Sequence, residues 1–169
     1  MSIFVRFCIL TLTRKVPPMP DLWLDRVFSL SGLIAMAGWL ALVFTPLQPR
    51  LAQAVATFIV PTVIGLAYAG LIARYWSEAA GGFSSLDEVS ALFSHRGVLL
   101  AGWLHYLAFD LFVGAWEVRE AQWVGLPHWL TLPALTLTFL FGPIGLLVFL
   151  GLRAARLRYA PLRTQGATA

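Results

Sequence analysis

Four apolar stretches, each about as long as a lipid bilayer is thick, dominate this sequence of 169 residues. An α-helix rises about 1.5 Å per residue, so about 20 apolar residues cross the hydrocarbon layer of a membrane. With 59% hydrophobic and 12% charged side chains, the chain is too apolar for a soluble domain of its size. The sequence predicts an all-α, polytopic membrane protein, a bundle of four transmembrane helices over residues 26–44, 51–73, 97–116 and 129–152.

Short connections between these stretches predict that neighbouring helices run antiparallel. Pro46 and Pro49 fall between the first two stretches, where they favour a tight turn. The longer central connection holds Ser85 and Glu88 at the spacing of a capping box, followed by apolar residues on one helical face. We expect a short amphipathic helix over residues 86–95 at the membrane surface, a packed connector rather than a lid over a site.

The distribution of basic residues predicts the orientation. In a four-helix arrangement ten of the 12 Lys and Arg residues lie on one side, against Arg50 and Arg119 on the other. Because basic residues collect on the cytoplasmic side, both termini and the central loop are expected in the cytoplasm. The Arg-, Ala- and Leu-rich composition favours a bacterial inner membrane.

The transmembrane domain is expected over residues 21–156. Residues 1–20 are expected to form an N-terminal arm with a weak signal-peptide pattern; the alternative is a start at Met19, which would suit the rest of the sequence better. Residues 157–169 are expected to form a basic, flexible C-terminal tail.

Several kinds of site find no support in the sequence. The single cysteine, Cys8, permits neither an internal disulfide nor a cysteine-based metal cage. No phosphate loop, nucleophile elbow, zinc motif or dinucleotide fingerprint occurs. His105 and His128 would differ in depth by about 16 Å, which makes them a poor pair of haem ligands. We expect no metal and no cofactor, and no nucleic-acid partner despite a net charge of +4.

Polar side chains within the third apolar stretch are the candidate catalytic residues. At 100° per residue, Tyr106, Asp110 and Glu117 share one helical stripe, and His105 lies about 140° away from Asp110. A carboxylate in hydrocarbon is costly, so Asp110 is expected to point into the bundle. Tyr106 and, from the fourth stretch, Thr136 are its expected hydrogen-bond donors.

Proline residues in the neighbouring stretches supply candidate partners for His105. Pro143 leaves the Phe139 carbonyl without its helical amide, so the imidazole is expected to donate to that carbonyl. The Thr62 hydroxyl is expected to donate to the other ring nitrogen. A histidine that merely packs in the bundle is the alternative.

Aromatic residues suggest a binding slot. Trp39 and Trp103 lie deeper than the interfacial tryptophans, and with Phe109 they are candidate walls for a long hydrophobic ligand. Thr62 and Thr136 complete the predicted ligand-binding set. Packing of the bundle is again the alternative.

The run GWLHYLAFDLFVGAWE, followed by GLPHWLTLPALTLTFLFGPIGLL, closely resembles the neoxanthin-synthase-like family, named for the plant abscisic-acid-deficient four proteins. The resemblance extends over about residues 25–152, and the family also occurs as small bacterial membrane proteins. It implies a link to carotenoids, because the plant members are plastid membrane proteins required to form the allenic carotenoid neoxanthin from the epoxide violaxanthin. It supplies no catalytic residues that can be transferred to this chain.

We therefore expect an intramembrane enzyme that isomerises a carotenoid or another long isoprenoid without a cofactor. Protonated Asp110 would be the acid and neutral His105 the base, although they are separated by about 7.5 Å along the helix axis. The alternatives are a non-catalytic lipid- or carotenoid-binding or assembly protein, and a small proton-coupled carrier. Besides the bilayer and a ligand, a second copy of the chain is an expected partner, because glycines such as Gly32 and Gly70 allow helices to approach closely.

Overall fold

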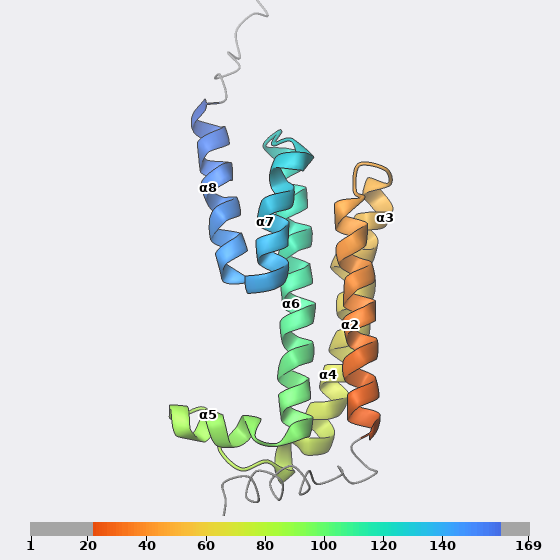
Figure 1. The fold of residues 1–169 in the computed structure, drawn as a ribbon, viewed down its shortest axis with the longest axis vertical. Helices are drawn as coiled ribbons and strands as arrows, with labels where there is room; N and C mark the ends of the chain where they lie inside the picture. Colours follow the sequence, from red (N-terminus) through yellow and green to blue (C-terminus); the bar gives the residue numbers. More distant parts are fainter. Residues whose placement is uncertain (1–21, 160–169) are drawn as a thin grey trace, which may run out of the picture.

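The computed structural model describes residues 22–159, so the expected N-terminal arm and most of the expected tail lie outside the described residues. Those 138 positions, 22 to 159, are almost entirely helical (Figure 1). The elements, in chain order, are α2 (Leu22–Val43), α3 (Pro49–Ala54), the π-helical turn η2 (Val55–Ile59), α4 (Val60–Tyr75), the 3₁₀ turn η3 (Trp76–Glu78), α5 (Leu86–Phe93), α6 (Arg96–Trp123), α7 (His128–Phe141) and α8 (Pro143–Tyr159).

Three helical segments in the described part of the chain are long and apolar enough to cross a membrane. They are Leu22–Val43, Pro49–Glu78 and Arg96–Trp123. They correspond to the first three spans predicted from the sequence: the first begins four residues earlier and ends one residue earlier than predicted, and the other two extend beyond the predicted bounds at both ends. The chain is therefore a membrane protein with an all-α fold.

The second long segment is continuous although a proline lies within it. Pro61 has no amide hydrogen to offer the carbonyl of Thr57, and the helix widens into the π-helical turn η2 just before this proline. The turn leaves Thr57 buried beside α6, where its hydroxyl accepts from Arg119 at 2.9 Å. Arg119 also donates to Gln53 at 3.1 Å, so these polar groups hold α3 and η2 against α6.

Helix α6 lies at the centre of the fold, between α2 and α4 on one side and α7 on the other (Figure 1). Leu104, Leu111 and Val118 along it are fully buried. Glycines allow α2 to come close: Gly38 faces Leu111, and Gly114 faces the Trp39 ring. Burial of apolar side chains along the whole of α6 fixes the direction in which its polar stripe points.

The single helix expected over residues 129–152 is two helices in the structure, so a four-span bundle is not confirmed. Helix α7 ends at Phe141, Gly142 has a φ of 49°, and α8 begins at Pro143. Glycine adopts a positive φ without steric cost, and proline is favoured at the first position of a new helix. Helix α8 therefore runs back beside α7 instead of continuing its direction (Figure 1).

Contacts with α6 fix this helical hairpin. Arg153 of α8 forms a 2.6 Å ion pair with Glu120, and the Nε of Arg156 donates to the Gly125 carbonyl at 3.2 Å. Phe149, fully buried, packs edge-on against Trp116. The last turns of α8 thus lie level with the last turns of α6. The hairpin enters the bundle from one end and returns to the same end.

The hairpin changes the charge distribution on which the expected orientation rested. The C-terminal end of α8 lies at the end of the molecule that holds the α2–α3 turn, not at the α5 end (Figure 1). The described arginines then divide five to three: Arg50, Arg119, Arg153, Arg156 and Arg158 against Arg26, Arg74 and Arg96. The predicted excess of basic residues on the side of the central loop is not found among residues 22–159.

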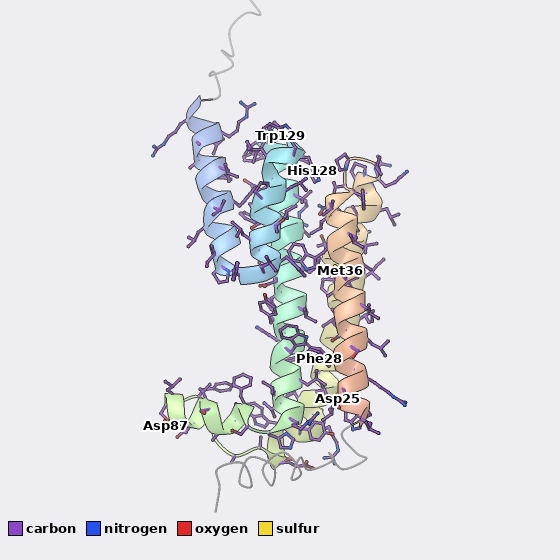
Figure 2. All side chains as sticks on the ribbon, viewed as in Figure 1. Asp25, Phe28, Met36, Asp87, His128 and Trp129 are labelled. Atoms are coloured by element: carbon purple, nitrogen blue, oxygen red, sulfur yellow. The ribbon has the colours of Figure 1, made fainter. Side chains whose placement is uncertain are left out.

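Cysteine labelling should reveal this topology. In a Cys8→Ser background, Gln48→Cys and Arg158→Cys should react with a membrane-impermeant maleimide from one side of the membrane, and Asp87→Cys from the other. All three native side chains are exposed, and Figure 2 shows Asp87 at the far end from α8. A single fourth span would instead place Arg158→Cys on the side of Asp87→Cys. Labelling of intact and opened cells separates the two arrangements.

The short helix predicted in the central connection is confirmed as α5. The Ser85 hydroxyl accepts from the Glu88 amide at 3.2 Å, which caps the first turn. The Glu88 carboxylate accepts in return from the amide of Ser84, not from that of Ser85. Leu92 is buried, and α5 lies across the end of α6 (Figure 1).

Candidate functional site

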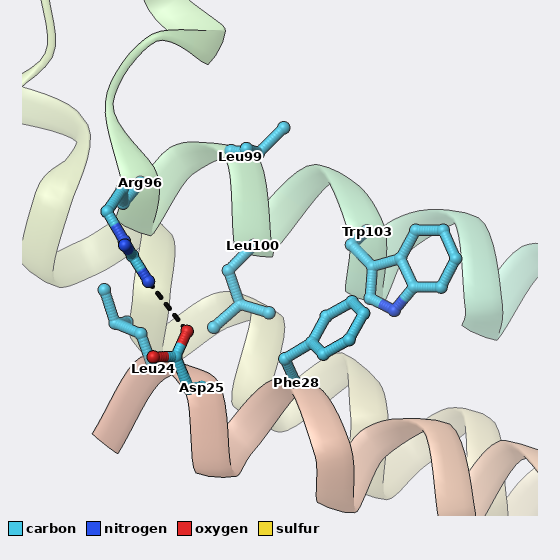
Figure 3. A pocket seen from close by; sticks show the side chains of 7 residues that line it. All are labelled: Leu24, Asp25, Phe28, Arg96, Leu99, Leu100 and Trp103. Carbon is cyan, nitrogen blue, oxygen red and sulfur yellow. Dashed lines mark hydrogen bonds and ion pairs between the residues drawn. The ribbon is translucent and has the colours of Figure 1, made fainter. Parts of the chain in front are cut away.

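An apolar hollow of about 400 Å³ opens between the first turns of α2 and α6 (Figure 3). Its polar end is the ion pair between Arg96 and Asp25, at 2.7 Å. The Phe28 and Trp103 rings form its opposite wall, with their centroids 5.5 Å apart. The hollow thus joins a charged pair at one end of the helices to an aromatic wall deeper in the bundle.

Two further hollows continue this space along α2. One of about 490 Å³ shares Phe28 and Trp103 with the first, and one of about 150 Å³ shares Met36 and Phe139 with the second. Figure 2 shows Phe28 and Met36 along the same helix. We call the three together the α2 groove. Its lining runs along α2 from residue 24 to residue 43, a length of about 28 Å for 19 helical steps.

Tyr106 forms part of the wall of the α2 groove near its middle. Its hydroxyl donates to the Phe139 carbonyl at 3.2 Å. Asp110 lies four residues further along α6, one turn away on the same helical face. This places a half-buried carboxyl group one helical turn from a tyrosine that lines the groove.

The turn between α7 and α8 covers Asp110. A Cβ atom at Gly142 would lie 3.1 Å from both carboxylate oxygens, so only the glycine backbone fits at this distance without displacing a neighbour. Asp110 Oδ2 is buried and has no hydrogen-bond partner among residues 22–159. The Asp110 carboxyl group therefore lies between the groove wall and the tip of the hairpin.

Glu117 is a second carboxyl group on the same face of α6, and it is fully buried. Thr138 of α7 donates to its Oε1 at 2.8 Å, while its Oε2 has no partner within the described part of the chain. Gly145 of α8 packs directly on Thr138. The sequence stripe contained Glu117, but a straight fourth helix gave it no special surroundings, and its place in the site became visible only with the hairpin.

His105 points away from this face. Its side chain is exposed, stacks on Phe109 with ring centroids 4.5 Å apart, and lies 5.9 Å from the Tyr68 ring. It lines a separate hollow of about 290 Å³ beneath α5. The Phe139 carbonyl, the expected partner of His105, accepts from Tyr106 instead. The structure therefore does not bring His105 and Asp110 together.

The residues expected to bind a ligand do not lie together in the structure. Trp39, Trp103 and Thr136 line the α2 groove. Phe109 lies with His105 on the other side of α6, and Thr62 is exposed on α4. The Thr136 hydroxyl donates to the Leu132 carbonyl at 3.0 Å, within its own helix. The predicted donation from Thr136 to Asp110 is not present.

The other end of the α2 groove is also polar. His128 Nε2 lies 3.0 Å from the Val43 carbonyl, and because a carbonyl only accepts, the ring nitrogen is the donor. This bond ties the start of α7 to the end of α2. Nowhere in residues 22–159 do three or more His, Cys, Asp or Glu side chains gather as a metal site would require.

Three membrane-length helices and a helical hairpin around buried carboxyl groups make this chain a polytopic integral membrane protein. It belongs to the ABA4-like family: the family model for ABA DEFICIENT 4-like proteins matches residues 26–149. The match confirms the family resemblance seen in the sequence and includes Tyr106, Asp110, Glu117 and the hairpin tip. Comparison with curated proteins and with solved structures gave no match.

Proposed function

We propose that this protein is an intramembrane isomerase that binds a carotenoid or another long isoprenoid in the α2 groove and rearranges it by acid–base chemistry. The observation that carries the proposal is the position of Tyr106, whose side chain lines the groove one helical turn from Asp110, a carboxyl group with one buried, unpartnered oxygen among residues 22–159. Membership of the ABA4-like family supports the choice of a carotenoid-like ligand. A bacterial inner membrane is the proposed location.

The groove suits a rod-shaped apolar molecule with a polar group at each end. Its walls are mostly aliphatic and aromatic, and its length of about 28 Å approaches the thickness of the hydrocarbon layer. The Asp25–Arg96 pair lies at one end, and His128 closes on the Val43 carbonyl at the other. Hydroxyl groups at the two ends of a ligand would find polar partners there.

The reaction transfers one proton from the site to the ligand and one proton from the ligand back to the site. In the proposed step, the Tyr106 hydroxyl donates to an epoxide oxygen of the ligand while protonated Asp110 replaces the phenolic proton. The C–O bond breaks as the new O–H bond forms. The Asp110 carboxylate then accepts, through Tyr106, a proton from the neighbouring carbon, and the C–H electrons form a C=C bond. No oxidant, reductant or net proton is consumed.

This mechanism uses one acid–base unit in place of the Asp110 and His105 pair expected from the sequence. His105 lines a different hollow, on the other side of α6. An epoxide oxygen and the proton on the adjacent carbon are close together, so a single unit reaches both more readily than two groups on opposite faces. The same groove would also serve a non-catalytic carotenoid-binding protein, which is the second candidate function.

A matched pair of glycine substitutions tests the groove. Gly32 lines it, and a Cβ atom there would meet nothing within 4 Å, so Gly32→Leu should fold while its side chain fills the groove. Gly70 on α4 is equally open but lies outside the groove. In a xanthophyll-producing host, we expect the carotenoid that copurifies with Gly32→Leu to fall at least about tenfold.

The Gly70→Leu protein should retain the pigment of the unmodified chain, measured by chromatography of extracts from equal amounts of folded protein. Equal pigment in both variants would contradict binding in the α2 groove. Bound pigment that is chemically identical to the host's own carotenoids would favour the binding protein over the isomerase.

A further inference from the structure

Two carboxyl groups, the half-buried Asp110 and the fully buried Glu117, lie along α6 under the hairpin. Glu117 follows Asp110 by seven residues, which is two helical turns and about 10 Å along the axis. Each has one oxygen that is buried and lacks a partner among the described residues. Seven residues are also nearly two full turns, so the two groups lie on the same face of α6. They form a line that points from the middle of α6 towards its C-terminal end.

A charged pair continues this line to the end of the molecule. Glu120 follows Glu117 by three residues and pairs with Arg153 of α8 at 2.6 Å. The Glu120 side chain retains 19% of its exposure and that of Arg153 retains 31%. The pair therefore connects the buried carboxyl groups with the surface at which the hairpin enters the bundle.

A purely structural role explains Glu117 poorly. A buried carboxyl group with an unpartnered oxygen is unfavourable, and an apolar side chain or a glutamine would fill the position at lower cost. Thr138, its one partner in the described residues, has a hydroxyl group that both donates and accepts, so it can also pass a proton. The backbone at Gly142 and Gly145 lies close to Asp110 and Thr138, which shields this line from lipid.

We propose that Glu117 is a proton-relay residue that connects Asp110 with the aqueous surface at the Glu120–Arg153 pair. Each transfer breaks an O–H bond on one carboxyl group or water molecule and forms one on the next, with no change in oxidation state. The ionisable or proton-carrying groups that face this relay are Asp110 and Glu120 from α6, Thr138 from α7 and Arg153 from α8. The relay would let Asp110 exchange its proton with water at the surface without opening the groove to water.

Infrared spectroscopy of the full-length protein in lipid nanodiscs tests the relay without any ligand. The C=O stretching band of protonated Asp110 is identified as the carboxyl band that disappears in Asp110→Asn. After transfer of the protein to D₂O, the shift of this band measures how fast the Asp110 proton exchanges with solvent. We expect Glu117→Gln to slow this exchange at least about tenfold, because the route then lacks its middle group. Glu78→Gln, an exposed position at the other end of the molecule, should leave the rate unchanged.

Thr138→Val keeps the shape of the side chain but removes the hydroxyl group, and it should also slow the exchange. This second variant tests the relay if Glu117→Gln does not fold. Melting temperatures matched to the unmodified protein separate a relay from a packing defect. Exchange at the original rate in either folded variant would overturn the proposal and point to entry through Tyr106 and the groove. Absence of the Asp110 band would overturn it as well. Ligand binding plays no part in this measurement, so its failure is distinct from failure of the proposed isomerase.

Discussion

Replacement of Asp110 by asparagine should abolish formation of the isomerised product while the ligand remains bound. Asparagine keeps the size and hydrogen-bonding capacity of the side chain but cannot supply a proton to Tyr106. General acid–base catalysis contributes roughly 10² to 10⁴ in rate, so product formation should fall by about that factor. The measurement is chromatography of carotenoids from a xanthophyll-producing host, with membrane levels of each variant matched.

Three further variants identify the catalytic unit. Tyr106→Phe should lose product to a similar extent, because Tyr106 is the member of the unit that lines the groove. Asp87→Asn, an exposed carboxyl group on α5, is the matched control and should retain full product. His105→Ala distinguishes the two mechanisms. Product in His105→Ala supports the single Tyr106–Asp110 unit, whereas loss of product with normal folding would restore His105 as the base.

Helical periodicity was sufficient to predict which polar residues of α6 share one face. The 100° rotation per residue places Tyr106, Asp110 and Glu117 on one stripe and His105 on another, and the structure shows that separation. The high cost of a charge in hydrocarbon correctly indicated that Asp110 faces protein. These properties belong to one helix and do not depend on how the other helices are connected.

The partners across the helix interface could not be predicted in the same way. The apolar run over residues 129–152 has the composition of one span, and the Gly142–Pro143 pair is compatible with a kink as well as with a reversal. Helix α6 runs to Trp123, seven residues past the predicted end of the third span, so α7 begins about 10 Å further along α6 than expected. That shift brings the Phe139 carbonyl to Tyr106 and Thr138 to Glu117. An error in the end of one helix thus became an error in the list of site residues.

The hairpin also explains why the site lies where it does. The α7–α8 turn ends at the level of Asp110, so α7 covers the upper half of the polar stripe and leaves the lower half to the α2 groove. A full-length fourth helix would have packed along the whole of α6. The shortened helix leaves a hollow beside Phe28 and Trp103 while Glu117 and one oxygen of Asp110 stay buried.

Close packing of α8 on α7 should depend on Gly145. Gly145→Ala is expected to lower the free energy of unfolding by about 2–3 kcal/mol, because the added methyl group overpacks against a rigid neighbour. A Cβ atom there would lie 2.0 Å from the backbone nitrogen of Thr138, which cannot move aside as a flexible side chain would. Gly151 lies in the same helix with nothing within 4 Å of a Cβ atom. Gly151→Ala should therefore be neutral, or stabilise by up to about 1 kcal/mol. Unfolding by dodecyl sulfate in mixed micelles measures both.

The Gly145→Ala and Gly151→Ala variants also test whether the position of the hairpin affects the proposed site. If Gly145→Ala displaces α8 from α7, the Thr138 bond to Glu117 and the Arg153 pair with Glu120 should weaken together, since both depend on the position of the hairpin. The infrared C=O band of Asp110, identified by its loss in Asp110→Asn, should then change in the Gly145→Ala protein. It should stay unchanged in the Gly151→Ala protein. Equal stability of the two alanine variants would mean that α8 does not pack on α7 as described, and the cover over Asp110 and Glu117 would have to come from another part of the chain.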